Sequence, residues 1–332
     1  MQNLTVISSR VRLARNYTDL PFNLTASPED AQALISRTLT AMDAAGIRDR
    51  FSLIRLSDLS ENQMKLLEEE KVISEDLMKS PETAAVLLDE KDRLSIMMNE
   101  DDHLRIQAVR AGEALQDAAD CVFHVEDAFS REVNFAFDRE LGYLTACPTN
   151  TGTGMRASLQ MHLPMLAQYK QMGAVGQIVA KVGLNIRGVY GEGSDALGCI
   201  YQISNQTTLG RTEEELLRTV LAVGKQLAEK EEMLRERAMQ EDRVSIEDSV
   251  FRAQGILEGA RKMELKEFYG LWSSLRLGML LGLVREKFET MNLLLEQAQN
   301  AHLMAYTERQ LSGADLNTAR ASRIRELLSY GE

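Results

Sequence analysis

Three arginines stand within six residues near the start of the chain, at Arg10, Arg12 and Arg15. Because side chains alternate along a β-strand, Arg10 and Arg12 would share one face, and Val11 and Leu13 the other. A planar guanidinium can bind two phosphate oxygens at once, which makes such a strand a candidate phosphate-binding element. The same pattern is typical of a solvated strand edge, so taken alone it leaves both interpretations open.

A second group of polar residues follows the apolar segment that ends at Met98. Residues 99–105 read Asn-Glu-Asp-Asp-His-Leu-Arg, which places three carboxylates beside His103 and Arg105. Hard divalent cations need carboxylates that converge from several elements, so a metal site is one interpretation. The other is a carboxylate that acts as a base or orients a substrate beside a phosphate-binding Arg105.

Two glycine-containing segments complete the candidate chemistry. Residues 147–158 read C-P-T-N-T-G-T-G-M-R-A-S, in which small residues would let backbone N–H groups approach an anion and Arg156 would complete the cradle. The segment is not a Walker A loop, because it contains no GxxxxGK[ST] pattern. In residues 187–193, Glu192 lies between two glycines and five residues after Arg187, a pattern that also suits an ordinary hairpin loop.

Composition and charge exclude several classes of protein. The chain of 332 residues has 38 Lys and Arg against 50 Asp and Glu, a net charge of −12, which argues against nucleic-acid binding. No apolar run approaches the roughly 18 residues of a membrane-spanning helix, and the first residues lack a signal-peptide pattern. Three cysteines without a CxxC pair predict neither disulfides nor a zinc site, so we expect a cytoplasmic protein away from membranes. The isolated His124, His162 and His302 are typical of structural or surface histidines, and no metal ligand is predicted.

The strand and helix patterns predict the scaffold that must position these segments. Short apolar runs pair around turn residues at 83–88 with 94–98, at 135–137 with 143–145, and at 184–190 with 198–203. This hairpin spacing predicts an antiparallel β-sheet flanked by helices, an α+β fold. A long helix over 212–241 precedes helices at about 246–260, 264–282, 284–306 and 315–330. We therefore expect two domains, residues 1–240 and an all-α C-terminal domain of residues 241–332.

The four polar segments, in this order and spacing, resemble the guanidino phosphotransferases, or phosphagen kinases. Residues 147–158 match that family's signature Cys-Pro-[Ser/Thr]-Asn-x-Gly-Thr-x-x-Arg-x-Ser. The resemblance implies that residues 1–240 are the catalytic domain, with the glutamine-synthetase/guanidino-kinase-like fold. Members that act on free creatine or arginine have a helical domain before the strand that carries the first arginines. Here that strand begins near residue 5, and the catalytic segments are instead followed by a helical C-terminal extension. That arrangement is similar to the McsB-type bacterial protein arginine kinases.

The resemblance implies roles for the residues that match family motifs. Glu192 and Asp101 would be the catalytic carboxylates, and Cys147 the active-site cysteine. The ATP phosphates would be bound by Arg10, Arg12, Arg105, Arg156 and Arg187. The rest of the nucleotide site would comprise Ser8, Ser9, Val11, Ala157, Ser158, Leu159, Gln160, Gly188, Val189, Tyr190, Gly191 and Glu192. The Mg²⁺ that accompanies ATP would be held mainly by the phosphates and water.

The implied function is ATP-dependent phosphorylation of arginine residues in proteins, which would mark them for a Clp protease. The implied partners are protein substrates, an activator of the McsA type, a heat-shock repressor and a Clp protease, and the kinase would be a homodimer. A kinase for a small free guanidine is a further interpretation, which the missing N-terminal domain disfavours.

Three departures from the family patterns leave an alternative open, a catalytically weak adaptor that binds nucleotide or client proteins. Asp101 stands where the family usually has Glu, and Lys71 where it usually has a His that contacts the nucleotide. In residues 316–321 only Arg320 and Ala321 remain of the phosphoarginine-binding motif of McsB-type kinases. An ordinary amphipathic last helix is the favoured interpretation there.

Overall fold

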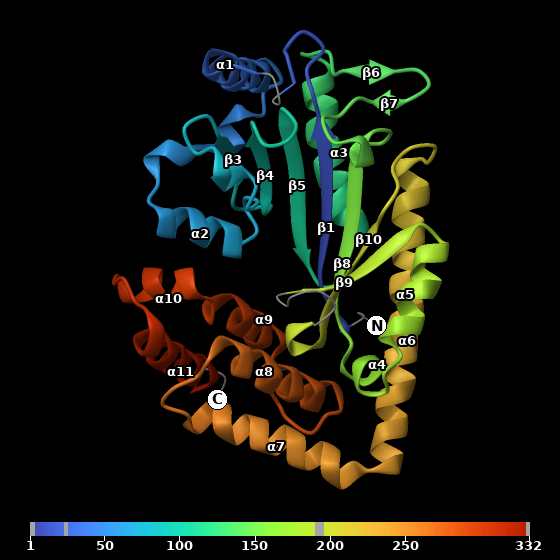
Figure 1. Cartoon of the computed structure of the whole chain (residues 1–332), viewed down its shortest axis with the longest axis vertical. Helices are drawn as coiled ribbons and strands as arrows, with labels where there is room; N and C mark the ends of the chain where they lie inside the picture. The colour runs from blue at the N-terminus through green and yellow to red at the C-terminus, as the bar shows by residue number, and fades with distance from the viewer. Residues whose placement is uncertain (1–3, 23–25, 190–195, 330–332) are drawn as a thin grey trace.

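The computed structural model describes residues 4–22, 26–189 and 196–329. Figure 1 shows a twisted β-sheet in the upper part of the molecule and a group of helices below it. The sheet has eight strands in the order β2-β3-β4-β5-β1-β8-β10-β9, each antiparallel to its neighbours. The strands are β1 (Val6–Arg15), β2 (Ser52–Arg55), β3 (Ala85–Asp89), β4 (Leu94–Met98), β5 (Leu104–Ala111), β8 (Met155–His162), β9 (Leu184–Gly188) and β10 (Ile200–Asn205). No helix in these ranges is long and apolar enough to cross a membrane.

The three predicted hairpins are confirmed. Strands β3 and β4 pair around the turn after Asp89, and β9 pairs with β10. The middle hairpin is a short separate ribbon of β6 (Phe137–Asp138) and β7 (Gly142–Tyr143). The predicted antiparallel α+β fold is therefore confirmed, although the central place of β1 between β5 and β8 could not be read from hairpin spacing.

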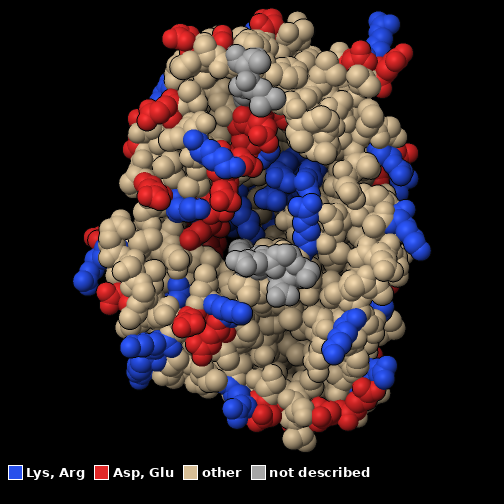
Figure 2. All heavy atoms as spheres, in the orientation of Figure 1, with Lys and Arg blue, Asp and Glu red and all other residues tan. Residues whose placement is uncertain are grey.

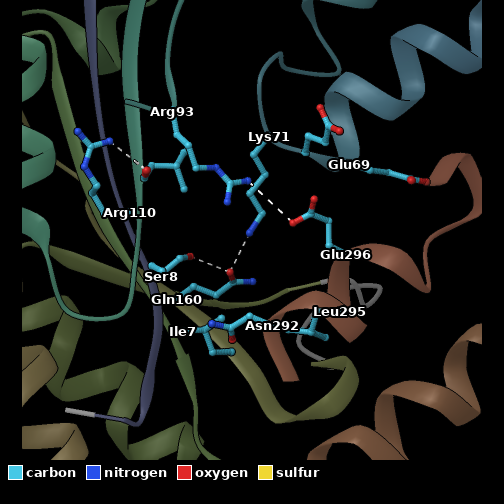
Figure 3. Close-up of a pocket in the computed structure, with 13 residues that line it drawn as sticks. Ile7, Ser8, Glu69, Lys71, Arg93, Arg110, Gln160, Asn292, Leu295 and Glu296 are labelled. Carbon is cyan, nitrogen blue, oxygen red and sulfur yellow. Dashed lines mark hydrogen bonds and ion pairs between the residues drawn. The ribbon is translucent and has the colours of Figure 1, made fainter. Parts of the chain in front are cut away.

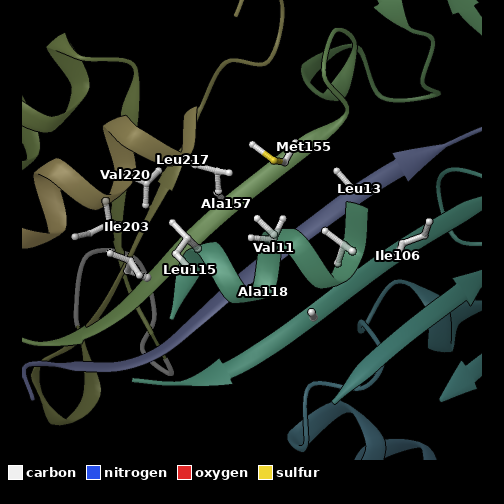
Figure 4. Packing of buried hydrophobic residues seen from close by; sticks show 14 of the residues in the cluster. Val11, Leu13, Ile106, Leu115, Ala118, Met155, Ala157, Ile203, Leu217 and Val220 are labelled. Atoms are coloured by element: carbon white, nitrogen blue, oxygen red, sulfur yellow. The ribbon is translucent and has the colours of Figure 1, made fainter. Parts of the chain in front are cut away.

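The two faces of the sheet differ in chemistry, as the alternation along residues 6–15 predicts. Val11 and Leu13 are fully buried on one face, together with alternate residues of β5 and β8 such as Ile106 and Ala157. Helices α3 (Leu115–Ser130) and α6 (Glu213–Glu241) pack on this face (Figure 4). The opposite face, called the open face below, carries the polar residues that alternate with this core.

Helix starts follow local capping chemistry. Ser27, Ser60 and Thr212 each form a capping box with the side chain three residues later, at the starts of α1 (Pro28–Ala44), α2 (Glu61–Glu69) and α6. Such caps satisfy backbone N–H groups that have no partner within the helix. The remaining helices before the long α6 are α4 (Pro164–Gln168) and α5 (Met172–Lys181).

Five helices after residue 242, called the C-terminal helices below, pack against one end of the sheet (Figure 1). They are α7 (Arg243–Gly259), α8 (Leu265–Leu280), α9 (Phe288–Gln297), α10 (Asn300–Thr307) and α11 (Gly313–Ser329). Their core centres on the fully buried Trp272 and includes Ile7 and Ile200 from the sheet. Ser273 on α8 also lies 2.8 Å from Nε2 of the buried His162, so His162 has the structural role expected of it.

One predicted helix, over 284–306, is wrong because the segment is two helices. The chain leaves the helix at Ala298 and Gln299, and α10 then begins without a side-chain cap of its own. Glu69 of α2 supplies that cap, since its carboxylate accepts hydrogen bonds from the backbone N–H groups of Ala301 and His302 at 3.0 and 3.1 Å. A residue more than two hundred positions away therefore fixes this helix start.

Candidate functional site

Five arginines reach the open face from four strands of the sheet. Arg10 and Arg12 come from β1, and the others are Arg105 on β5, Arg156 on β8 and Arg187 on β9. Arg12 lies directly opposite Arg156 in the β1–β8 register. Figure 2 shows basic side chains gathered in a hollow at the centre of the molecule, with acidic side chains on its rim. The structure thus brings together the five arginines that the family resemblance assigns to the phosphates, whereas Arg15 is buried and pairs with Glu126 on α3.

Burial and mutual repulsion dominate the electrostatics of this cluster. Burial and the charges of Arg10, Arg105 and Arg156 lower the pKa of Arg12 well below its ordinary value, while Glu100 opposes this shift. Burial, followed by the charges of Arg187 and Arg105, also lowers the pKa of Arg156. Positive groups that lower each other's pKa repel one another, so a bound polyanion would relieve an unfavourable charge distribution.

Arg105 is oriented by the buried Glu100. The Glu100 side chain is 1% exposed, and its Oε1 accepts hydrogen bonds from both Arg105 Nη1 and Ser74 Oγ. Its Oε2 accepts from the backbone N–H of Asp101 at 3.3 Å. Both carboxylate oxygens of Glu100 are therefore occupied, which makes it a positioning group and leaves it unsuited to accept a substrate proton.

Asp101 has the opposite environment. Its side chain is 54% exposed, and Oδ2 lies 4.0 Å from Arg105 Nη2, beyond hydrogen-bond distance. An exposed carboxylate beside an arginine cluster can align a cationic group and accept a proton from it. Of the adjacent acids at positions 100 and 101, only Asp101 is placed to act on a substrate.

The remaining residues of the 99–105 segment hold it against the loop that contains Cys147. Asp102 Oδ1 accepts hydrogen bonds from Asn16 Nδ2 and from the backbone N–H of Ala146, each at 2.7 Å. Asn16 Oδ1 in turn accepts from the backbone N–H of His103. These bonds connect the segment after β4 with the residue before Cys147, whose sulfur lies 3.0 Å from Thr149 Oγ1. Both oxygens of Glu100 and Oδ1 of Asp102 are therefore engaged by protein groups, which disfavours the metal interpretation of residues 99–105.

Four of the backbone N–H groups of residues 147–158, which the sequence predicts to cradle an anion, are already engaged by the protein. The N–H groups of Asn150, Thr151, Gly152 and Thr153 donate to carbonyl oxygens of the protein. The glycines are required by packing instead. Gly154 has φ +61°, and a Cβ there would lie 2.6 Å from the carbonyl oxygen of Ala14. The group of this segment that faces the other arginines on the open face is Arg156.

Several predicted nucleotide-binding residues do not present their side chains to the open face. Val11, Ala157 and Leu159 lie in the core on the opposite face. Ser9 Oγ donates to the carbonyl oxygen of Gly112 and accepts from the N–H of Ala114, so it is also committed elsewhere. Gly188 lies at the end of β9. Tyr190, Gly191 and Glu192 lie outside the described residues.

A pocket beside the arginines is lined mostly by polar residues of the open face. Ser8, Arg10, Lys71, Ser158, Gln160, Val189 and Gln202 are among its lining residues. Gln160 Oε1 accepts hydrogen bonds from Lys71 Nζ at 2.8 Å and from Ser8 Oγ at 3.0 Å (Figure 3). Lys71, which departs from the family pattern, therefore reaches the same surface as the predicted nucleotide residues.

Two serines that hold the site together were missed by sequence reasoning. Ser74 donates to Glu100, and Ser204 Oγ accepts from Arg156 Nη2 at 3.2 Å. Both residues come from segments far from their partners in sequence, and isolated serines carry no recognisable pattern. Only the three-dimensional arrangement assigns them to the site.

Comparisons with known proteins agree with this arrangement. Residues 33–234 match the ATP:guanido phosphotransferase C-terminal catalytic domain, and residues 243–332 match the protein-arginine kinase McsB C-terminal domain. A protein-arginine kinase of Symbiobacterium thermophilum is 42% identical over 98% of this chain and 93% of its own length. One from Brevibacillus brevis is 39% identical over 98% of this chain and 92% of its own.

Solved structures have the same fold. The duplicated taurocyamine kinase of Schistosoma mansoni with bound transition-state analogue components superposes with a TM-score of 0.64 and 26% identity, over 72% of this chain and 35% of that one. Lombricine kinase superposes with a TM-score of 0.63 and 23% identity, over 71% of this chain and 68% of that one.

Proposed function

Because the chain belongs to the protein-arginine kinase family of ATP:guanido phosphotransferases, we propose that it transfers the γ-phosphoryl group of ATP to the guanidino group of arginine residues in proteins. The observation that carries this proposal is the convergence of five arginines on the open face beside the exposed Asp101. Triphosphate oxygens match such a cluster, because each guanidinium can bind two of them.

The proposed chemistry uses two carboxylates. A guanidinium is a poor nucleophile while protonated, so the site must align its nitrogen and accept its proton. We assign these tasks to Asp101 and to Glu192, which lies outside the described residues. The guanidino nitrogen forms a bond to the γ-phosphorus as the bond to the β,γ-bridging oxygen breaks. The nitrogen's proton passes to a carboxylate, and the products are ADP and a phosphoramidate.

The arginines would stabilise the transferring phosphoryl group, since phosphoryl transfer depends on positioning and charge stabilisation. Within the described ranges, the one group of three His, Cys or carboxylate ligands close enough for a metal lies away from this cluster, at Glu70, Glu296 and His302. We propose that Mg²⁺ arrives with the ATP phosphates and is held mainly by them and by water. Bound Mg²⁺ would neutralise charge that develops on the phosphates.

Other site assignments rest on family resemblance and on placement. Ser8, Ser158, Gln160 and Val189 line the pocket beside Arg10, which supports a role in nucleotide binding. Cys147 is partly exposed next to the segment that carries Asp101, which supports a place at the substrate. We also propose that residues 1–240 and 241–332 are separate domains, with the boundary at the end of α6.

The biological context remains part of the proposal and derives from the resemblance. Phosphoarginine would mark client proteins for a Clp protease, and an activator of the McsA type and a heat-shock repressor would be partners. The kinase would act in the cytoplasm as a homodimer. The three cysteines, none in a disulfide, are consistent with a reducing compartment.

The test is direct phosphoryl transfer. The purified chain would be incubated with Mg·ATP and an arginine-rich protein, and mass spectrometry at neutral pH would detect acid-labile phosphoryl groups on arginine. Free arginine would be tested in parallel. Glu192→Gln, which keeps shape but removes charge, is the matched control and should bind ATP without transferring phosphate.

Each result decides between interpretations. Modification of the protein by the wild type but not by Glu192→Gln would support protein arginine kinase activity. Turnover of free arginine alone would show that the substrate is a small guanidine. ATP binding without transfer to either, also after addition of candidate activators, would contradict the proposal and favour a nucleotide-binding adaptor.

A further inference from the structure

Three ionisable side chains that the proposed reaction does not use meet where α2, α9 and α10 come together. They are Glu70 at the end of α2, Glu296 on α9 and His302 on α10, and one ligand atom of each lies within 4.8 Å of the other two. His302 Nε2 is 3.5 Å from Glu296 Oε1 and 3.9 Å from Glu70 Oε1. His302, which stands apart from any motif in the sequence, therefore has acidic neighbours in the structure.

His302 is held in one orientation by Glu69. The histidine is 5% exposed, and its Nδ1 lies 2.9 Å from Glu69 Oε2. Glu69 is itself fixed, because it accepts two backbone hydrogen bonds at the start of α10. A histidine whose Nδ1–H is donated to a carboxylate presents Nε2 as a ligand, as metal-bound histidines commonly do.

The other ring nitrogen is buried and lacks a hydrogen-bond partner. Within the described structure, Nε2 of His302 makes no hydrogen bond, although it faces two carboxylates. A lone pair that faces two negative groups at close range is unfavourable unless a cation lies between them. Without a metal that cation is a proton. Burial lowers the pKa of His302, but the contacts with Glu296 and Glu69 outweigh burial and raise the pKa to about 9.

We propose that Glu70, Glu296 and His302 bind a divalent transition-metal ion of the Zn²⁺ type, with water completing the coordination. Ligand atoms about 2.0–2.1 Å from a tetrahedral metal lie roughly 3.3 Å apart, so the separations of 3.5 and 3.9 Å from Nε2 need only a small closure. One imidazole and two carboxylates suit Zn²⁺ better than Mg²⁺, which prefers oxygen ligands. The lack of a CxxC pair excludes only a thiolate site.

The site would join two parts of the molecule. Glu70 precedes Lys71, whose side chain reaches Gln160 on the open face, whereas Glu296 and His302 belong to the C-terminal helices. Figure 3 shows Lys71 and Glu296 on the same pocket, with Arg93 directed at the Glu296 carboxylate. A bound metal would fix the C-terminal helices to the segment that carries Lys71. This inference does not depend on the proposed kinase activity.

The test is Zn²⁺ binding by the full chain. Protein freed of metal by a chelator would be titrated with ZnCl₂ by calorimetry, and native mass spectrometry would count bound ions. We expect one ion per chain in this site, and at least about 100-fold weaker binding in His302→Gln and Glu70→Gln. Glu69→Gln should weaken binding about 10- to 100-fold, as loss of an outer-shell partner does. His124→Gln, at an exposed histidine of α3, is the matched control and should bind as the wild type does.

The result that would overturn the proposal is equally specific. If wild type and His302→Gln bind Zn²⁺ equally, or neither binds, these residues are not a metal site. If His302→Gln does not fold, Glu70→Gln decides, because Glu70 is only half-buried. Nuclear magnetic resonance of the imidazole gives a second readout: a His302 ring that keeps its Nε2 proton under saturating Zn²⁺ would show that the proton is the native occupant.

Discussion

Replacement of Asp101 by Asn separates catalysis from nucleotide binding, because Asp101 is exposed and does not hold the arginine cluster. Its Oδ2 is 4.0 Å from Arg105 Nη2, and an exposed pair of this kind contributes less than about 1 kcal/mol. The KM for ATP should therefore change less than about fivefold. A carboxylate that takes the substrate proton contributes about 10²- to 10⁴-fold, so kcat should fall by that factor, or about 3 to 5 kcal/mol in activation free energy.

The assay is initial-rate phosphorylation of a protein substrate at several ATP concentrations, with urea unfolding as a check on stability. Glu100→Gln is the contrasting variant. Because Glu100 is buried and orients Arg105, this change should raise the KM for ATP and lower the stability, as loss of one partner of a buried ion pair does. A kcat for Asp101→Asn within about threefold of wild type would refute the assignment of Asp101 as a catalytic carboxylate.

Asp101→Glu restores the side-chain length that is usual in the family. A displacement of about 1 Å at a reacting centre can change the rate on the order of a hundredfold. The same rate assay should therefore give activity equal to or higher than wild type, up to that factor. Activity well below wild type would show that the backbone has adapted to the shorter acid.

Three further outcomes follow from the structure. Arg156→Ala should weaken ATP binding about 10- to 150-fold in calorimetry, the effect of about 1.5 to 3 kcal/mol in charged hydrogen bonds, without lowering the melting temperature, since its removal relieves repulsion. Gly154→Ala should cost about 2 kcal/mol or more in urea unfolding, because its Cβ would meet the carbonyl oxygen of Ala14 at 2.6 Å. Burial raises the pKa of Glu231 from 4.5 to about 7, so the folded state holds its proton where the unfolded state has lost it. Stability should then fall between about pH 4.5 and 7, by about 3 kcal/mol at most, and Glu231→Gln should remove this dependence.

Local patterns predicted those parts of the fold whose cause is local. The alternation along residues 6–15 correctly placed Val11 and Leu13 in the core and Arg10 and Arg12 on the open face. The predicted helix start at residue 212 likewise has a local cause, the capping box of Thr212, and the caps at Ser27 and Ser60 are of the same kind. Such features depend on neighbours in sequence, so they can be read before any tertiary structure is known.

Features with a distant cause could not be predicted in this way. The start of α10 depends on Glu69, and the environment of His302 is formed by three acids from α2 and α9. The glycines of the 147–158 segment suggested an anion cradle, but tertiary contacts with Ala14 and Thr208 are what require them. The convergence of the arginines was expected only from family resemblance, because strand order cannot be derived from spacing alone.

The central position of β1 has a consequence for how the protein is made. The strand ends at Arg15, yet its second neighbour, β8, ends about 147 residues later, at His162. At a synthesis rate of about 5–20 residues per second, the first strand waits roughly 7 to 30 s before both of its partners exist. β5 can pair with β1 once residue 111 has been made, but the other edge of β1 stays open until β8 exists, and the charged residues discourage its association with other nascent chains. Because Arg187 on β9 belongs to it, the face that carries the five arginines can form only after more than half of the chain has been synthesised.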